Sequence, residues 1–175
     1  MWLVYGFFAV LAGPVVIEFC GYWWHRLGEH GGRLGRSVVA KHYRHHEKDY
    51  PFNNFNPGEK QYRKAGSWSW YVLGALIIAF LFVLLPRPYS FVAIISGILY
   101  AKFVMSYLHG KFHISTELEK SAWFRGRRRL HETHHWGPYN YGISFFVMDR
   151  IFGTYRTNFP KAKEPNFPNS NESTH

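Results

Sequence analysis

Uncharged apolar residues are concentrated in three blocks along the chain, and charged stretches separate them. The blocks cover residues 2–17, 68–85 and 89–108, and the one charge inside them is Lys102. A membrane-spanning helix needs about 20 mostly apolar residues, so each block with its flanks predicts one span. Tryptophan and tyrosine gather at the block ends, as they do where membrane helices meet lipid headgroups. The pattern predicts an all-α integral membrane domain with about three spans.

The first block contains a Gly13-Pro14 pair, which predicts a kink or a break between two short helical pieces. No Lys or Arg precedes Arg26, so the block lacks the basic start of a cleaved signal peptide and is expected to remain as an anchor. The alternative for all three blocks is that they are buried helices of a soluble protein. Three such blocks among 175 residues would leave too little polar chain to cover them.

The distribution of basic residues predicts how the chain crosses the membrane. The stretch 25–64 holds nine Lys and Arg residues, which places it in the cytoplasm by the positive-inside rule. The second span then crosses outward, turns near 86–88, and the third returns, so that 109–175 is also cytoplasmic. A net charge of +10 can indicate nucleic acid, an anionic membrane or an acidic protein as partner. The apolar blocks favour the bilayer, and no nucleic-acid partner is expected.

The C-terminal stretch differs in composition from the remainder. Residues 160–175 are polar, carry two prolines besides Pro160, and show no periodicity. Such a segment buries too little apolar surface to fold, so we expect a disordered tail after a membrane domain at 1–159.

Histidine is unevenly distributed along the chain. Ten of the 11 histidines fall in four tight groups, and only His175 stands alone. The groups are His25 with His30; His42, His45 and His46; His109 with His113; and His131, His134 and His135. All four lie just beyond the ends of the predicted spans, on the predicted cytoplasmic side. We therefore expect a cytosolic helical cap that carries them.

The spacing within the groups indicates metal binding. Residues three and four apart share a helix face, so each His-x-x-His-His is expected to bring three imidazoles together, and His109 and His113 also share a face. His25 and His30 are five apart, about 140° around an ideal helix. They would not chelate one ion from a straight helix, but could serve two neighbouring ions or straddle a helix end. Ten imidazoles exceed one coordination sphere and suit two ions with four to five ligands each.

The available ligand types narrow the choice of metal. Structural zinc usually takes cysteine with histidine, but the chain has one cysteine and no C-x-x-C. Hydrolytic two-metal sites generally use bridging carboxylates, whereas the histidine groups contain only Glu29 and Glu132. A nitrogen-rich shell without thiolate fits redox-active iron with open positions for dioxygen. Zinc can replace iron in purified protein.

The four groups together resemble the membrane fatty acid hydroxylase/sterol desaturase superfamily. The resemblance rests on these motifs: EFCGYWWHRLGEH (18–30), KHYRHH (41–46), YLHGKFH (107–113) and RLHETHHWGPYNYGISFFVMDRIFGTY (129–155). Members of this superfamily carry such histidine groups, which are called histidine boxes. The resemblance implies a small helical membrane domain whose ten box histidines bind two iron ions. It also implies that dioxygen is a co-substrate, that two electrons come from a partner, and that oxygen enters a C–H bond of a lipid.

Box spacing bears on the branch of the superfamily. Four residues separate the histidines of the first box and three those of the third, which resembles fatty acyl 2-hydroxylases more than sterol desaturases. A fatty acyl or sphingolipid substrate is therefore expected first, with a carotenoid hydroxylase or a sterol desaturase/oxidase as alternatives. No fused cytochrome b5-type domain is seen, so electrons are expected from a separate ferredoxin- or cytochrome-type protein.

Carboxylates near the boxes are candidates to orient the ligands. A metal-bound imidazole usually donates its other N–H to a carboxylate or a carbonyl. Asp149, in the MDRIFGTY ending, is the first candidate, ahead of Glu18, Glu29, Glu117 and Glu132; a helix cap or an ion pair is its alternative role. The Asn140-Tyr141-Gly142 stretch predicts a turn after the last box.

Two other classes of protein remain open from the sequence. A histidine-rich membrane metal transporter or metal-binding protein would place polar ligands inside its spans, and the predicted spans contain no histidine. A soluble helical metalloprotein would stay in solution without detergent.

Overall fold

The computed structural model describes residues 2–52, 54 and 58–158, and the expected tail at 160–175 lies outside them. The described residues form helices and connecting loops without a strand, which confirms the all-α fold. The α-helices are α1 (Trp2–Trp23), α2 (Arg36–Arg44), α3 (Ser69–Leu84), α4 (Arg87–Tyr100), α5 (Tyr107–Ile114), α6 (Ala122–Trp136) and α7 (Val147–Ile151). Three segments are π-helices, η1 (Trp24–His30), η2 (His45–Asp49) and η3 (Ala101–Ser106), and η4 (Glu117–Lys120) is a 3₁₀-helix.

Two continuous helices are long and apolar enough to cross a membrane. Trp2–His30 joins α1 to η1 over 29 residues, and Arg87–Ile114 joins α4, η3 and α5 over 28 residues. Their most apolar stretches are only 11% and 22% buried within the protein, so these surfaces suit lipid rather than a soluble core. The second predicted span, at 68–85, forms α3, whose 16 residues are shorter than a span requires. The expected count of three therefore becomes two helices of spanning length and one shorter apolar helix.

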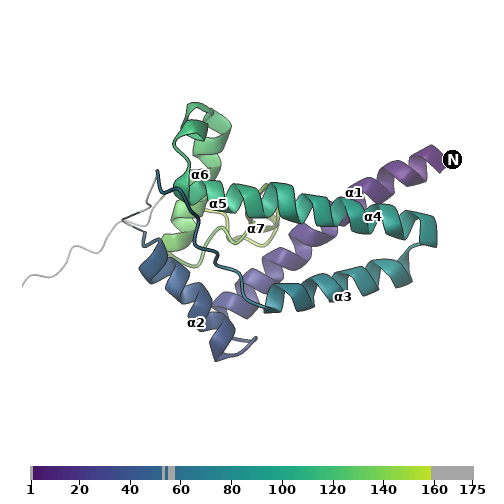
Figure 1. Cartoon of the computed structure of the whole chain (residues 1–175), viewed down its shortest axis with the longest axis horizontal. Coiled ribbons are helices and arrows are strands. Elements are labelled where there is room, and N and C mark those ends of the chain that lie inside the picture. Colours follow the sequence, from purple (N-terminus) through teal and green to yellow (C-terminus); the bar gives the residue numbers. More distant parts are fainter. Residues whose placement is uncertain (1, 53, 55–57, 159–175) are drawn as a thin grey trace, which may run out of the picture.

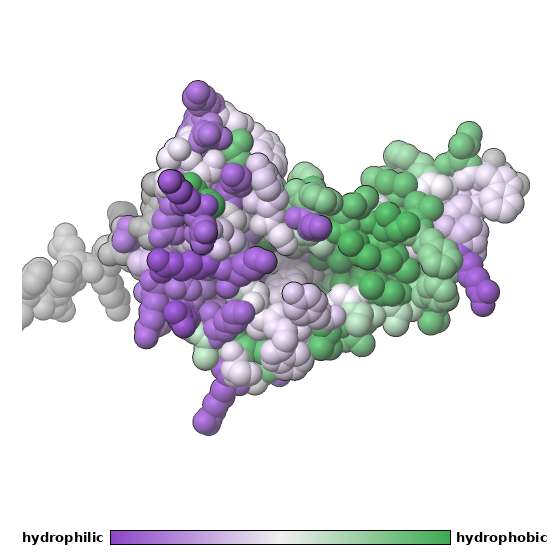
Figure 2. Space-filling view, in the orientation of Figure 1, coloured by the Kyte–Doolittle hydropathy of each residue, from purple (hydrophilic) through white to green (hydrophobic). Residues whose placement is uncertain are grey.

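The apolar helices occupy one end of the molecule and the polar helices the other. In Figure 1, α3 and α4 form a hairpin beside α1, whereas α2 and α6 lie at the end far from the N-terminus. Figure 2 shows hydrophobic residues over the α1, α3 and α4 end and hydrophilic residues gathered at the opposite end. Leu73, Ile77 and Leu81 of α3 form a buried cluster with Ala93 of α4, against which α1 packs. The separation is the one expected of a membrane domain with a polar cap.

A close backbone contact joins α1 to α4. A Cβ added at Gly13 would lie 2.1 Å from the Ala93 carbonyl oxygen and 2.6 Å from the Gly97 nitrogen. Only glycine allows this approach, as at small-residue contacts between membrane helices. The break predicted at Gly13-Pro14 is wrong, because α1 runs through Pro14 without interruption. Gly13 serves helix packing instead of ending the helix.

The polar cap has a small core of its own. Leu108 and Phe112 of α5 pack with Phe124 of α6 and with Ile143, which follows the last histidine group. The Ser121 hydroxyl caps α6 by accepting a hydrogen bond from the Phe124 N–H. These contacts fix α6 against α5. Helix α5 carries His109 and His113, and α6 carries His131, His134 and His135.

The α1–α4 contact makes a prediction about stability. Replacing Gly13 with alanine forces the two helix backbones apart and is expected to lower stability by about 1–3 kcal/mol. The midpoint of thermal unfolding in detergent, followed by circular dichroism, measures the loss. Gly6→Ala is the matched control on the same helix, because nothing lies within 4 Å of its added Cβ. Equal midpoints for the two variants would contradict the packing role of Gly13.

Candidate metal centre

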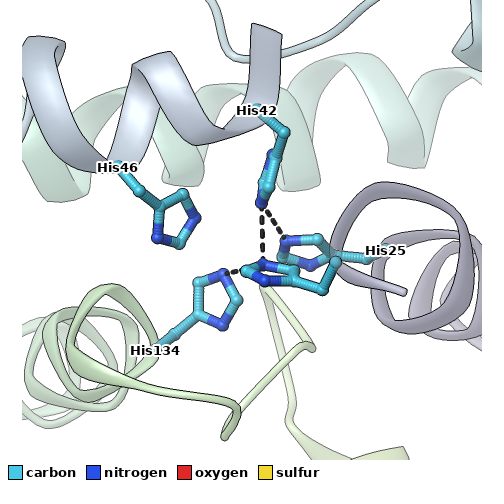
Figure 3. Close-up of side chains that lie close together, drawn as sticks. His25, His42, His46 and His134 are labelled. Carbon is cyan, nitrogen blue, oxygen red and sulfur yellow. Dashed lines mark hydrogen bonds between the residues drawn. The ribbon is translucent and has the colours of Figure 1, made fainter. Parts of the chain in front are cut away.

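The cap brings ten histidines into two groups of five. The first group contains His25, His30, His42, His46 and His134, and the second contains His45, His109, His113, His131 and His135. Within each group, one nitrogen from every ring lies within 4.8 Å of the others, a spacing at which five imidazoles can hold a metal ion. Figure 3 shows His25, His42, His46 and His134 turned toward one another, with His42 and His46 from one continuous helix and the other two from separate helices. The groups touch, since the rings of His46 and His135 stack 4.0 Å apart.

Each His-x-x-His-His motif is divided between the groups. His42 and His46 belong to the first group and His45 to the second. The last motif mirrors this arrangement, with His131 and His135 in the second group and His134 in the first. Residues i and i+4 share a helix face, whereas the neighbouring i+3 residue lies about 100° away from i+4. The expectation that all three imidazoles of a motif converge is therefore wrong.

His25 and His30 belong to one group, although a straight α-helix would separate them. The segment Trp24–His30 is a π-helix, in which the backbone bonds run from residue i to i+5. Residues five apart then lie above one another, and the two ring centroids are 5.1 Å apart. The expected separation of the pair assumed α-helical geometry, which this segment does not have.

Backbone carbonyls fix the orientation of three rings. The Nδ1–H groups of His25, His134 and His135 donate to the carbonyl oxygens of Tyr141, Tyr139 and Tyr50 at 2.7, 2.7 and 2.8 Å. A carbonyl only accepts, so each Nδ1 must carry the proton and each Nε2 must expose a lone pair. Metal-binding histidines are held in the same way, by an outer partner that fixes the tautomer and the ring plane.

The Nε2 atoms of the first group converge on a small volume. His42 Nε2 lies 3.1 Å from His25 Nε2 and 2.8 Å from His30 Nε2, and the latter lies 3.3 Å from His134 Nε2. His25 and His134 direct Nε2 lone pairs into this volume, where a bound cation would be stabilised. Among the described residues, buried His46 Nε2 also lacks a hydrogen-bond partner, an arrangement that costs free energy unless a ligand is bound. The donor set therefore fits metal ions.

The cap histidines are held in the neutral form that binds metals. Burial lowers the pKa of six of them, and the charges of neighbouring imidazoles lower it further: His42, His45, His46, His131, His134 and His135. For His45 the pKa falls to about 3. These rings are thus unprotonated at neutral pH and can offer nitrogen lone pairs.

Glu29 is the carboxylate that lies beside an imidazole. Its Oε2 is 3.5 Å from His42 Nδ1, and its Oε1 accepts a hydrogen bond from Trp70 Nε1 at 2.8 Å. In the second group, the equivalent position is taken by a phenol, since the Tyr62 hydroxyl lies 2.9 Å from His109 Nδ1. Burial raises the pKa of Tyr62, which keeps this phenol neutral.

Asp149 was expected to accept a hydrogen bond from an imidazole N–H, but it binds the backbone of the loop at 141–142 instead. Its carboxylate accepts hydrogen bonds from the N–H groups of Tyr141 and Gly142 at 2.7 and 2.8 Å, and from the Thr154 hydroxyl at 2.7 Å. Burial raises the pKa of Asp149, and these three bonds oppose that rise by favouring the charged form. Asp149 thereby fixes the peptide of Tyr141, whose carbonyl orients His25.

The segment at 140–142, where the sequence predicts a turn, is an irregular loop without a hydrogen-bonded turn. Asn140 adopts a left-handed backbone conformation with φ of 50°. Its side-chain amide donates to the carbonyls of Leu130 and Arg156 at 3.0 and 2.7 Å and its oxygen accepts from the Arg156 N–H. These bonds join the middle of α6 to the segment at Arg156, and they stabilise a conformation that asparagine tolerates better than most residues.

A cavity of about 530 Å³ opens beside the first group. Four of its five histidines line the cavity, and only His135 of the second group does so. Arg26, Tyr43, Trp136 and Tyr141 form other parts of the wall. The first group is thus the one that a molecule in this cavity would meet.

Sequence reasoning missed the outer partners of the histidines. Tyr50 and Tyr139 act through backbone carbonyls, which carry no side-chain signal. Tyr62 lies far along the chain from His109, which it contacts. Arg26 lines the cavity and follows His25 directly, but without a diagnostic spacing. Only Glu29 stood among the candidate acids.

The Asp149 contacts predict a loss of metal retention on substitution. An asparagine at this position keeps the shape but offers only one accepting atom, so a Tyr141 or Gly142 N–H loses its partner. We expect Asp149→Asn to weaken metal binding about 10–100-fold, as removal of such outer support does elsewhere. Competition with a chelator measures the change. Glu117→Gln, on exposed η4, removes a similar charge and should retain metal; equal retention in both variants would refute the positioning role.

Comparison with known protein families identifies the chain. The family model described as fatty acid hydroxylase matches residues 10–154, which include all ten clustered histidines and Asp149. No curated protein and no solved structure shows significant similarity to the chain. The match covers well over half of the 175 residues and agrees with the resemblance carried by the motifs. The chain belongs to the fatty acid hydroxylase family, within the membrane fatty acid hydroxylase/sterol desaturase superfamily.

Proposed function

We propose that this protein is a membrane-bound di-iron oxygenase that hydroxylates a C–H bond of a lipid. Fatty acyl lipids or sphingolipids are the favoured substrates. The observation that carries the proposal is the pair of touching five-imidazole groups, one of which faces a cavity. The family supports a membrane enzyme of the hydroxylase or desaturase type. A shell of ten nitrogens without thiolate or carboxylate suits iron better than structural zinc.

The ten histidines would hold two iron ions, five rings to each. When bound, the irons would supply dioxygen activation: one oxygen atom enters the C–H bond, and the other leaves as water with two electrons and two protons from outside. The electrons would come from a separate ferredoxin- or cytochrome-type carrier.

The protein's own residues position the reactants. Carbonyls of Tyr50, Tyr139 and Tyr141 hold the Nδ1 protons of three rings, so that these rings keep their Nε2 atoms directed inward. A lipid in the cavity would meet the first group, and the exposed apolar surfaces of α1 and α4 support a position of that group beside the bilayer. Burial of the second group would keep bulk water from the ion that it holds.

Metal content is the first test of the proposal. Elemental analysis of detergent-purified protein is expected to give about two iron atoms per chain, or zinc in their place after overexpression. His134→Ala removes a ligand from the first group and should lower the metal content, whereas His175→Ala, outside all groups, should not. Fresh wild-type protein without stoichiometric metal would overturn the assignment, as would a His134→Ala variant that folds and keeps its full complement.

Oxygen incorporation is the second test. Membranes containing the protein, supplied with an electron carrier and ¹⁸O₂, should convert an endogenous lipid into a product heavier by one labelled oxygen. Mass spectrometry detects the label, and His134→Ala membranes provide the background. A new double bond without label would identify a desaturase instead, and an unchanged lipid profile in iron-loaded wild type would count against the hydroxylase.

A further inference from the structure

Arg26 is the cation in the wall of the cavity beside the first histidine group. It lies on η1, directly after His25, and lines the cavity together with His30 and Tyr141. One N–H of its guanidinium donates to the Tyr22 hydroxyl at 2.9 Å. The guanidinium carbon lies 5.9, 5.5 and 5.9 Å from the ring centroids of Tyr22, Trp23 and Tyr141. Three aromatic rings and a hydroxyl therefore hold this charge in place.

The guanidinium has donors to spare. Arginine offers five N–H groups in a planar fork that matches a carboxylate or a phosphate. Among the ion pairs of the described residues, none involves Arg26, whereas Arg63 and Arg128 each contact two carboxylates. A half-buried arginine on a cavity wall, held by aromatic rings rather than by an acid, is arranged to receive an anion from outside.

The other charged residue of the wall does not offset Arg26. Glu47 lies on η2 and also lines a neighbouring surface hollow with Arg44 and Lys48. Glu47 is exposed, and among the ion pairs of the described residues none joins it to Arg26. Arg26 thus provides the cavity's unmatched positive charge beside the histidines.

The position of Arg26 limits how far a bound anion can lie from the first group. The Arg26 guanidinium carbon is 5.9 Å from the Tyr141 ring, and the His30 ring is 5.2 Å from the same ring, so the two lie within about 11 Å. Asp149 holds the backbone of Tyr141, the residue that both of them adjoin. A lipid whose acidic group binds Arg26 therefore presents carbons near its polar end, rather than its methyl end, to the histidines.

We propose that Arg26 binds the acidic headgroup of the lipid substrate, a carboxylate or a phosphate, and thereby directs oxidation to a carbon near that headgroup. The assignment rests on the proposed oxygenase function and specifies its substrate class. Neutral hydrocarbons such as carotenoids lack a group for Arg26. The aromatic residues around the guanidinium would exclude water from the ion pair and strengthen it.

Direct binding tests this assignment without turnover. Radiolabelled palmitate and hexadecyl phosphate are titrated into the purified protein in detergent, beside the neutral analogues methyl palmitate and hexadecanol. Wild type should bind one of the acidic lipids at least about tenfold more tightly than the neutral lipid of the same chain length. Arg26→Gln should abolish this preference and leave neutral-lipid binding unchanged. Arg36→Gln, an exposed arginine on α2, removes the same charge and should preserve the preference.

Further variants and competitors separate the outcomes. Arg26→Lys keeps the charge without the planar fork and should restore part of the preference, which guards against misfolding of the glutamine variant. Acetate and inorganic phosphate should compete far more weakly than the amphiphiles; equal competition would identify a free-anion site and overturn the lipid assignment. Equal wild-type affinity for palmitate, hexadecyl phosphate and the neutral lipids would also overturn it.

Product analysis provides a second readout that separates this proposal from the underlying one. The hydroxyl formed by wild type should lie near the polar end of the chain, and Arg26→Gln should distribute it over more positions. Labelled product without an acidic-lipid preference would refute the role of Arg26 and leave the oxygenase intact. Conversely, an acidic-lipid preference in a protein that contains no metal would support the role of Arg26 and refute the oxygenase proposal.

Discussion

The burial of ten neutral imidazoles is the constraint on which the remainder of the cap depends. Each ring must keep its proton on the outward nitrogen, because a proton on the inward nitrogen would occupy the space of a ligand bond. Carbonyl oxygens impose this choice at His25, His134 and His135, and they belong to loops rather than helices. The conformation of the loops at Tyr50 and at 137–142 is therefore as important for the centre as the helices that carry the histidines.

Two continuous helices connect the apolar end of the protein to the polar cap. His25 and His30 lie on the continuation of α1, and His109 and His113 lie on the continuation of α4. The close contact of Gly13 with α4 sets the spacing of these two long helices. Contacts deep in the apolar region thus help determine how the two groups meet at the polar end, so the centre keeps a fixed depth relative to the hydrophobic surface.

The sequence predicted the elements more fully than their local geometry. Apolar blocks and clustered histidines indicated an all-α membrane domain, and the fold agrees because hydrophobic length and residue type are local properties. The π-helix at Trp24–His30 could not be predicted, since nothing in its composition distinguishes i+5 from i+4 bonding. The division of each motif between groups depends on where neighbouring helices lie, which spacing within one helix does not contain. Asp149 was recognised as important but given the wrong contact, because the peptide it holds is defined only by the folded loop.

The division of each triple motif has a consequence for how the centre would assemble. Because α2 with η2 supplies rings to both groups, and α6 does the same, neither group can be completed while the other remains unformed. Filling one would order the segments that the other requires, so the two binding events are coupled through conformational entropy. A half-loaded centre would be the least populated state, and the chain would pass between empty and full in a nearly all-or-none manner.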